Sequence, residues 1–374
     1  MSGVYRRSMT ARSAAEAHRA ATPLELFFDL CFVVAVAQAA NALHHDLAEG
    51  RFAHAIPNYV LVFFAIWWAW MNFTWFASAY DTDDDWYRLT TLVQIAGALT
   101  MAAGVPRAFE MDYRIVTVGY VIMRLAMCTQ WLRAARSDPP RRVTALRFAT
   151  GIAVVQVGWI LRLLLDQPWY VVAGIILIAA ELAVPVWAER AEPTTWHPGH
   201  ITERYGLFTL IVLGEVVLGT TIAIQTAAAA HVDADLLILA GSALILVFGL
   251  WWLYFDRNAP EIARRLRTSF LWGYGHWVIF MATAAIGAGL AVAVDHLRHT
   301  AHVSDSAAGL AVGVPVSVWI LCVWLVRGAR AAAWPVAAVL VLAAAGTPAP
   351  VLVTAAVVAA LAVVTTWKAR REAL

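Results

Sequence analysis

The sequence predicts an all-α polytopic membrane protein with about twelve transmembrane helices. The first observation behind this prediction is composition. Of the 374 residues, 61% are hydrophobic and 14% are charged, whereas soluble domains contain about 45–50% apolar and about 25% charged residues. The second observation is a succession of apolar segments long enough to span a bilayer. The third is that the Lys and Arg residues gather in alternate loops.

The apolar segments follow one another along most of the chain. A transmembrane helix needs about 20 mostly apolar residues. The candidate segments are 24–43, 57–79, 89–105, 114–134, 143–165, 169–188, 205–226, 235–255, 270–294, 307–327, 332–346 and 350–367. The eleventh is the shortest, so we expect it to be re-entrant or strongly tilted.

The positive charges orient these segments. With the N-terminus in the cytoplasm and alternating spans, 21 Lys and Arg residues fall inside and five fall outside: Arg51, Arg107, Arg114, Arg162 and Arg298. Because cytoplasmic loops carry the excess of Lys and Arg, both termini are expected in the cytoplasm. The net charge of +2 is small and no basic block is present, which argues against a nucleic-acid partner.

The two halves of the chain resemble each other weakly. Residues 64–70 in the second span match residues 248–254 in the eighth, and the first span of each half carries an acid, Asp29 or Glu215. We therefore predict two parallel six-helix repeats; chance similarity between aromatic-rich helices is the alternative. The expected organisation is a cytoplasmic basic segment, two repeats and a cytoplasmic tail, at 1–21, 22–190, 191–367 and 368–374.

The first span begins with a helix-start motif and carries an acid one turn deeper. Thr22 is a suitable N-cap, Pro23 suits the first helical position, and Glu25 would complete a capping box. This structural role competes with a functional one for Glu25. Asp29 lies on the same face, too deep for a cap, so we expect it to pair with a cation or to take part in function.

A second polar motif opens the seventh span. His200, Glu203 and Arg204 gather at its cytoplasmic end, where Arg204 is either a site residue or an interface anchor. Glu215 follows about three turns later, near mid-span. An ionisable side chain at the bilayer centre costs about 2.5–3.5 kcal/mol on insertion scales. Glu215 is therefore the strongest candidate for a residue on an ion or solute pathway.

Arg124 and His276 also fall inside predicted spans. Arg124 requires a buried anion, for which Asp29, Glu181 and Glu215 are the candidates, and the pair is either functional or purely structural. His276 is either a group that titrates near neutral pH or a hydrogen-bonded packing histidine.

The loop at 80–88 concentrates acids on the cytoplasmic side, among them Asp81, Asp83 and Asp84. It could attract cations, but it lacks the glycine and the distal glutamate of an EF-hand; a solvated loop that caps the third span is the alternative. No phosphate-binding glycine loop, GxSxG, HExxH or CxxC is present, so we expect no metal site and no cofactor. The histidines of the outward loops have too common a spacing to predict a metal site: His44, His45, His296, His299 and His302.

Taken together, these motifs resemble the bacterial low-temperature-requirement A family. The resemblance covers roughly residues 20–290 and rests on the segments 22–30, 80–84, 203–208, 213–215 and 274–276. It implies a multi-pass protein of the bacterial plasma membrane, linked by name to growth in the cold. The family has no established biochemical activity that would extend to this chain.

A secondary transporter or an ion- or proton-coupled permease is the function that these features favour. Twelve spans, parallel halves and buried acids are typical of such proteins, and the expected partners are the lipid bilayer and an ion or small solute, with a homo-oligomer left open. The transport hypothesis expects Asp29 and Glu215 to face each other in a cavity near the midplane. A cation channel is one alternative. A membrane enzyme or scaffold with acids and His276 at its cytoplasmic face is the other.

Overall fold

The computed structural model is all-helical in the part of the chain that it describes, which is residues 7–13, 15–16, 19–256, 266–329 and 331–372. Those residues form twelve α-helices, one short 3-10 turn and no strand, which confirms the predicted fold class. Several of the arginines used to predict the orientation lie outside the described residues: Arg6, Arg257, Arg264, Arg265 and Arg330.

The helices α1 to α6 occupy Pro23–Ala48, Phe52–Tyr80, Asp85–Phe109, Arg114–Ser137, Arg142–Arg162 and Trp169–Glu189. The helices α7 to α12 occupy Pro198–Ala230, Ala234–Phe255, Leu266–Leu297, Asp305–Val326, Ala333–Ala344 and Pro350–Glu372. Eleven of these described helices are long and apolar enough to cross a membrane. The exception is α11, whose 12 residues extend over only about 18 Å, against a hydrocarbon core of about 30 Å. The structure thus confirms that the segment predicted at 332–346 is too short for an ordinary span.

The chain divides into two compact units. Unit 1 comprises Met1–Gln38 and Phe64–Arg204, and unit 2 comprises Ala39–Phe63 and Tyr205–Leu374. Helices α1, α2 and α7 therefore each contribute to both units. These units group residues by contact, which is a different property from internal similarity, so the repeats predicted at 22–190 and 191–367 stay a prediction.

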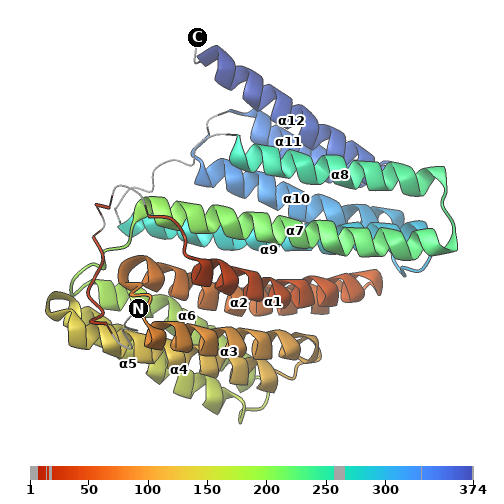
Figure 1. The fold of residues 1–374 in the computed structure, drawn as a ribbon. Helices are drawn as coiled ribbons and strands as arrows, with labels where there is room; N and C mark the ends of the chain where they lie inside the picture. Colours follow the sequence, from red (N-terminus) through yellow and green to blue (C-terminus); the bar gives the residue numbers. More distant parts are fainter. Residues whose placement is uncertain (1–6, 14, 17–18, 257–265, 330, 373–374) are drawn as a thin grey trace. The chain divides into compact units, whose positions relative to one another are not determined.

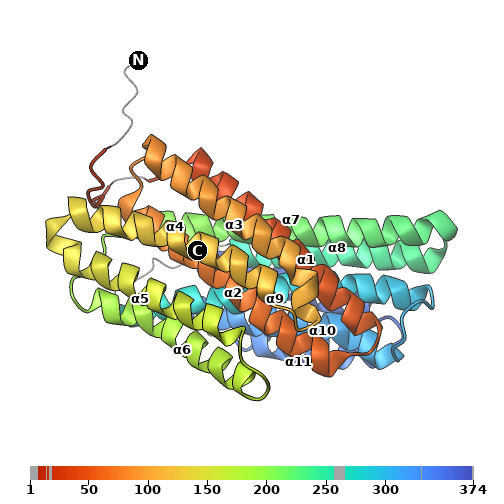
Figure 2. The ribbon, with the colours of Figure 1, turned by 90° about the horizontal axis from the view of Figure 1, so that it is seen from below.

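In unit 1, α3 packs against α4, α4 against α5, and α5 against α6. Figures 1 and 2 show these neighbours side by side. Helices α3 and α4 lie in close contact, because a Cβ on Gly119 would lie 2.5 Å from the carbonyl oxygen of Gly97. Small residues permit such contact between membrane helices. The core of unit 1 includes three tryptophans of α2 that are at most 1% exposed: Trp67, Trp68 and Trp70.

In unit 2, α9 packs against α10, which also contacts α11, and α8 packs against α12 (Figure 1). Gly289 of α9 lies directly against the backbone of Ala311 in α10, so a side chain at that position would collide with α10. The Ser317 hydroxyl of α10 donates a hydrogen bond to the carbonyl oxygen of Ala338 in α11. The C-terminal part of α1 belongs to this unit, where the backbone N–H of His302 donates a 2.7 Å hydrogen bond to the carbonyl oxygen of Ala48.

Candidate functional site

Unit 1 contains a buried ion pair between α1 and the first turns of α7. The Arg204 guanidinium donates from Nε to Oδ2 of Asp29 at 2.9 Å and from Nη2 to Oδ1 at 2.5 Å. The indole N–H of Trp70 donates to the same carboxylate at 2.6 Å. Asp29 and Arg204 are both fully buried. Of the two roles predicted for Asp29, the structure shows the ion pair, and Arg204 supplies the cation.

Glu25 combines the two roles that the sequence left open. It completes the capping box, because its Oε2 accepts from the backbone N–H of Thr22 at 2.8 Å while the Thr22 hydroxyl accepts from the N–H of Glu25 at 3.3 Å. Its Oε1 also lies 3.2 Å from Nε2 of His200 and 3.2 Å from Nη1 of Arg204. Glu203 lies at the edge of this cluster, where its carboxylate accepts from the backbone N–H of Ala21 at 3.3 Å.

Arg19, which the sequence analysis treated only as part of a basic segment, is a member of the same cluster. Its side chain is 1% exposed and reaches both Glu25 at 3.4 Å and Asp81 at 3.7 Å. It also donates to carbonyl oxygens in the last turn of α2, those of Ala77 and Ser78. Arg19 thereby fastens the N-terminal segment to unit 1. Its only signal in the sequence was a positive charge close to the start of the first span.

The acidic loop between α2 and α3 is mostly structural. Asp84 caps α3 by accepting from the N–H of Tyr87 at 2.7 Å, and it pairs with Arg133 at 2.6 Å. Asp83 forms an exposed pair with Arg88 at 2.8 Å. Asp81 is buried like Asp84, but its ion-pair partner, Arg19, is more distant at 3.7 Å.

Burial raises the pKa of Asp81 to about 6, and the neighbouring Glu25 carboxylate adds to the increase. The Arg19 guanidinium opposes this shift only in part. Two buried arginines, Arg19 and Arg204, face three buried carboxyls, Glu25, Asp29 and Asp81. Of the three carboxyls, that of Asp81 lies outside the spans. Its raised pKa means that it takes up a proton in mildly acidic solution.

Another buried carboxylate in unit 1, that of Glu181 in α6, is the partner of Arg124. Of the three anions considered for Arg124, the structure thus shows Glu181. The same carboxylate also accepts from Trp68 at 2.8 Å and from Tyr120 at 3.0 Å. Two longer contacts come from Trp159 at 3.3 Å and from Gln156 at 3.4 Å. Five donors on one carboxylate tie α2, α4, α5 and α6 together.

His276 in unit 2 is a packed, hydrogen-bonded histidine. Its Nε2 lies 2.9 Å from the Tyr254 hydroxyl and its Nδ1 lies 2.8 Å from the carbonyl oxygen of Trp272. The rings of Tyr205 and Phe280 pack against it. Both ring nitrogens are hydrogen-bonded. Of the two roles that the sequence left open for His276, the structure thus shows that of a packing histidine.

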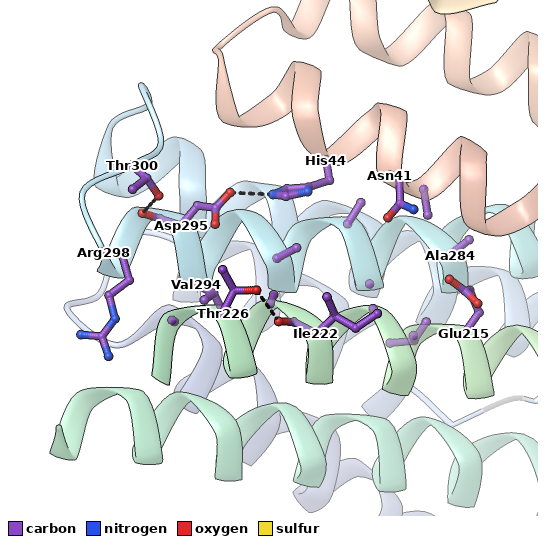
Figure 3. Close-up of a pocket in the computed structure, with 18 of the residues that line it drawn as sticks. Asn41, His44, Glu215, Ile222, Thr226, Ala284, Val294, Asp295, Arg298 and Thr300 are labelled. Atoms are coloured by element: carbon purple, nitrogen blue, oxygen red, sulfur yellow. Dashed lines mark hydrogen bonds and ion pairs between the residues drawn. The ribbon is translucent and has the colours of Figure 1, made fainter. Parts of the chain in front are cut away.

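Unit 2 also contains a cavity of about 530 Å³, which Figure 3 shows in close-up. Three helices line it: α1 through residues 40–44, α7 through residues 215–230, and α9 through residues 284–295, with Arg298 and Thr300 after α9. Its size is within the range of small-molecule sites, about 300–1,000 Å³. Twelve of the nineteen lining residues are glycines or have alkyl side chains.

Glu215 lines this cavity from near the middle of α7. Its side chain is half-buried, and among the described residues none forms a hydrogen bond or an ion pair with its carboxyl group. In this respect it differs from Asp29 and Glu181, which are held by arginines. Asp29 belongs to unit 1 and does not line the cavity, so the two acids do not face each other there as the transport hypothesis expected.

The polar groups at the other end of the cavity are paired. His44 Nε2 lies 2.7 Å from Oδ2 of Asp295, as the dashed line in Figure 3 marks. Arg298 pairs with Asp233 at 2.6 Å. Asp233 is the N-cap of α8, and the N–H of Leu236 together with Arg298 holds its pKa below the usual range. His44 was not predicted as a site residue because the spacing of the histidines alone is uninformative, and its partner comes from a helix more than 200 residues away.

The arrangement offers no evident metal centre. Within the described residues, no group of three or more His, Cys, Asp or Glu side chains is placed to hold a metal ion. The chemistry available in the cavity is therefore that of one unpaired carboxyl, a neighbouring carboxamide from Asn41 and apolar walls.

Comparison with known proteins places the chain in a family. Residues 20–369 match the family model described as bacterial low temperature requirement A protein (LtrA). An uncharacterized protein of Rhizobium meliloti (strain 1021) is 29% identical over 269 residues, which cover 67% of this chain and 64% of that protein. No solved structure matches the chain at a significant level. The all-helical fold and the match over nearly the whole length agree with the resemblance found in the motifs, and the chain belongs to the bacterial low-temperature-requirement A family.

Proposed function

We propose that this integral membrane protein is a secondary transporter, and that Glu215 is the group that takes up the coupling proton or a cation. The observation that carries the proposal is the unpaired Glu215 carboxyl in a cavity of about 530 Å³, near the middle of a membrane-spanning helix.

The energetics of burial make this carboxyl unusual. A charged group near the bilayer centre costs about 2.5–3.5 kcal/mol on insertion scales, so most such groups are paired or mark a pathway. Asp29 and Glu181 follow the first pattern, because an arginine and further donors hold each of them. Glu215 follows the second pattern. It can gain or lose a proton without breaking a contact within the described protein.

The proposed orientation determines which end of the cavity lies toward the outside of the cell. We place the protein in the bacterial plasma membrane with both termini in the cytoplasm, as the loop arginines predict; this orientation requires the short helix α11 to cross the membrane as well. Helices α1, α7 and α9 then run outward, and the cavity is lined by the later half of each. Glu215 lies at its inner end, where an outward-facing transporter would hold its coupling group.

The alternative of a membrane enzyme at the cytoplasmic face has less support. Two of its proposed acids are already engaged, since Asp29 is held by Arg204 and Asp83 pairs with Arg88. Neither leaves a carboxylate free for acid–base work on a substrate.

Flux through proteoliposomes tests the transport proposal. Purified protein would be reconstituted with a pH-sensitive dye inside, a pH gradient imposed, and Na⁺, K⁺ or small alkylammonium ions added in turn. For a transported solute, the internal pH is expected to change faster than in protein-free liposomes.

Glu215→Gln keeps the size of the side chain and removes its charge, so it is expected to reduce the rate to that of protein-free liposomes. Glu110→Gln, the same change at an exposed position between α3 and α4, is the matched control and should behave as wild type. Equal rates in wild type and Glu215→Gln would refute the role of Glu215.

A further inference from the structure

We infer that the solute bound in this cavity is a protonated primary alkylamine, which exchanges with a proton at Glu215. The inference rests on the proposed function, because it gives the coupling carboxyl a second ligand. It adds the chemical class of the substrate and the direction of coupling, neither of which follows from the presence of an acid alone.

The charge of the cavity selects a cation. Glu215 is unpaired, and the other charged groups of the lining have partners: His44 lies against Asp295, and Arg298 pairs with Asp233. An anionic solute would face the Glu215 carboxylate without compensation. A solute with one positive charge would neutralise it.

The free hydrogen-bonding groups select a donor-rich cation. The hydroxyls of Thr226 and Thr300 already donate their protons to the carbonyls of Ile222 and Asp295 at 2.9 and 3.0 Å, so they can only accept further hydrogen bonds. The Asn41 carboxamide and the Glu215 carboxyl have no hydrogen-bond partner among the described residues. In Figure 3 both lie toward the same end of the cavity, on α1 and α7. A primary ammonium has three N–H donors and can serve both acceptors at once.

The apolar walls of the cavity favour an organic cation over a bare metal ion. The lining near and beyond Glu215 is made largely of alanine and glycine: Ala40, Gly219, Ala223, Ala227, Ala288 and Ala291. Dehydrated Ca²⁺ requires about six to eight oxygen ligands, and Mg²⁺ about six. The Glu215 carboxylate and the Asn41 carboxamide together offer three oxygens, which is too few for such a shell. An alkyl chain fits against these walls and gains from the burial of its apolar surface.

Competition for one carboxyl produces exchange. Glu215 binds either a proton or the ammonium ion, because the ion pair requires the carboxylate form. One RNH₃⁺ therefore binds as one H⁺ leaves, and the cycle moves one positive charge in each direction. The coupling is antiport, and it needs no bond other than the O–H bond of the carboxylic acid to form or break.

The binding test uses the full chain in lipid nanodiscs, with n-hexylammonium titrated by calorimetry against three variants. Glu215→Gln removes the charge and should weaken binding by about 10- to 100-fold, as expected for a lost hydrogen bond to a charged group. Gly219→Leu should also block binding, because a side chain at Gly219 enters open space in the cavity and meets no atom within 4 Å. Gly214→Leu is the matched control, since Gly214 is equally open but does not line the cavity.

Wild type and Gly214→Leu should bind hexylammonium alike, and their affinity should fall as the pH is lowered while the size-exclusion profiles of all variants stay the same. Hexanoate, which has a similar chain and the opposite charge, should not bind. Equal affinity in wild type and Glu215→Gln, or stronger binding of K⁺ than of hexylammonium, would overturn the inference. In the liposome assay, a pH response to Na⁺ or K⁺ but not to hexylammonium would overturn this inference and leave the proposed function standing.

Discussion

Replacing Arg204 by glutamine tests whether the buried charge cluster of unit 1 holds that unit together. Nε of Arg204 lies 2.9 Å from Oδ2 of Asp29, and Nη1 of Arg204 lies 3.2 Å from Oε1 of Glu25. All three side chains are fully buried. Removal of the guanidinium leaves the Asp29 carboxylate with Trp70 as its remaining donor among the described contacts. Glu25 keeps Arg19, His200 and the backbone N–H of Thr22.

The magnitude follows from the burial of the pair. Breaking a buried ion pair by removing one partner typically destabilises a protein by about 3–5 kcal/mol, because a charge is left without compensation. We expect Arg204→Gln to lower the free energy of unfolding by an amount in this range. Unfolding in mixed micelles with increasing denaturing detergent, followed by tryptophan fluorescence, measures it.

The double variant Asp29→Asn/Arg204→Gln isolates the pair, because it removes both charges. It should be less destabilised than the sum of the two single variants. Arg88→Gln is the matched control: it removes the same kind of bidentate pair with Asp83 at an exposed site. It should leave stability unchanged, since exposed ion pairs contribute little. If Arg204→Gln unfolded at the same detergent fraction as wild type, the structural role of the cluster would be refuted.

Further predictions concern a loop carboxyl, the N-terminal segment and two spans. Burial raises the pKa of Asp81 to about 6, so the folded state binds more protons than the unfolded state between about pH 4 and 6, and stability falls as the pH rises through about 6. Asp81→Asn should abolish this fall, and thermal unfolding at about pH 5 and about pH 7.5 measures it; an undiminished pH dependence would contradict the assignment. Arg19→Gln should loosen the N-terminal segment and speed tryptic cleavage after Arg12, whereas unchanged cleavage would argue against fastening by Arg19. Glu181→Gln should destabilise the protein by about 3–5 kcal/mol, while Glu215→Gln should leave stability unchanged; equal losses would remove the distinction between them.

Much of the fold could be predicted because lipid imposes a simple requirement. A span needs about 20 apolar residues and internal backbone hydrogen bonds, so composition and segment length were enough to predict the helices. The short α11 was also recognised from length, and the capping box at Thr22 and Glu25 from local spacing. These are properties of single segments, and the sequence states them directly.

The partners of the buried charges were harder to predict, because each pair joins helices far apart in the sequence. Asp29 and Arg204 are 175 residues apart, and Arg124 and Glu181 are 57 apart. Spacing within a helix shows which residues share a face but does not show which helix covers that face. Arg19 was missed for a related reason. It lies in a polar segment without periodicity, and only its contacts with the last turn of α2 reveal its role.

The presence or absence of a partner separates three carboxyls that look alike in the sequence. Asp29 is neutralised by Arg204, and Glu181 accepts from five donors including Arg124, so a change of charge at either one would break contacts between helices. Such groups suit a fixed architecture. Glu215 has a cavity beside it in place of a partner, so protonation or cation binding there changes no described protein contact. A group that must be loaded and unloaded in every transport cycle requires this freedom, which is why the proposed coupling role belongs to Glu215 rather than to either paired acid.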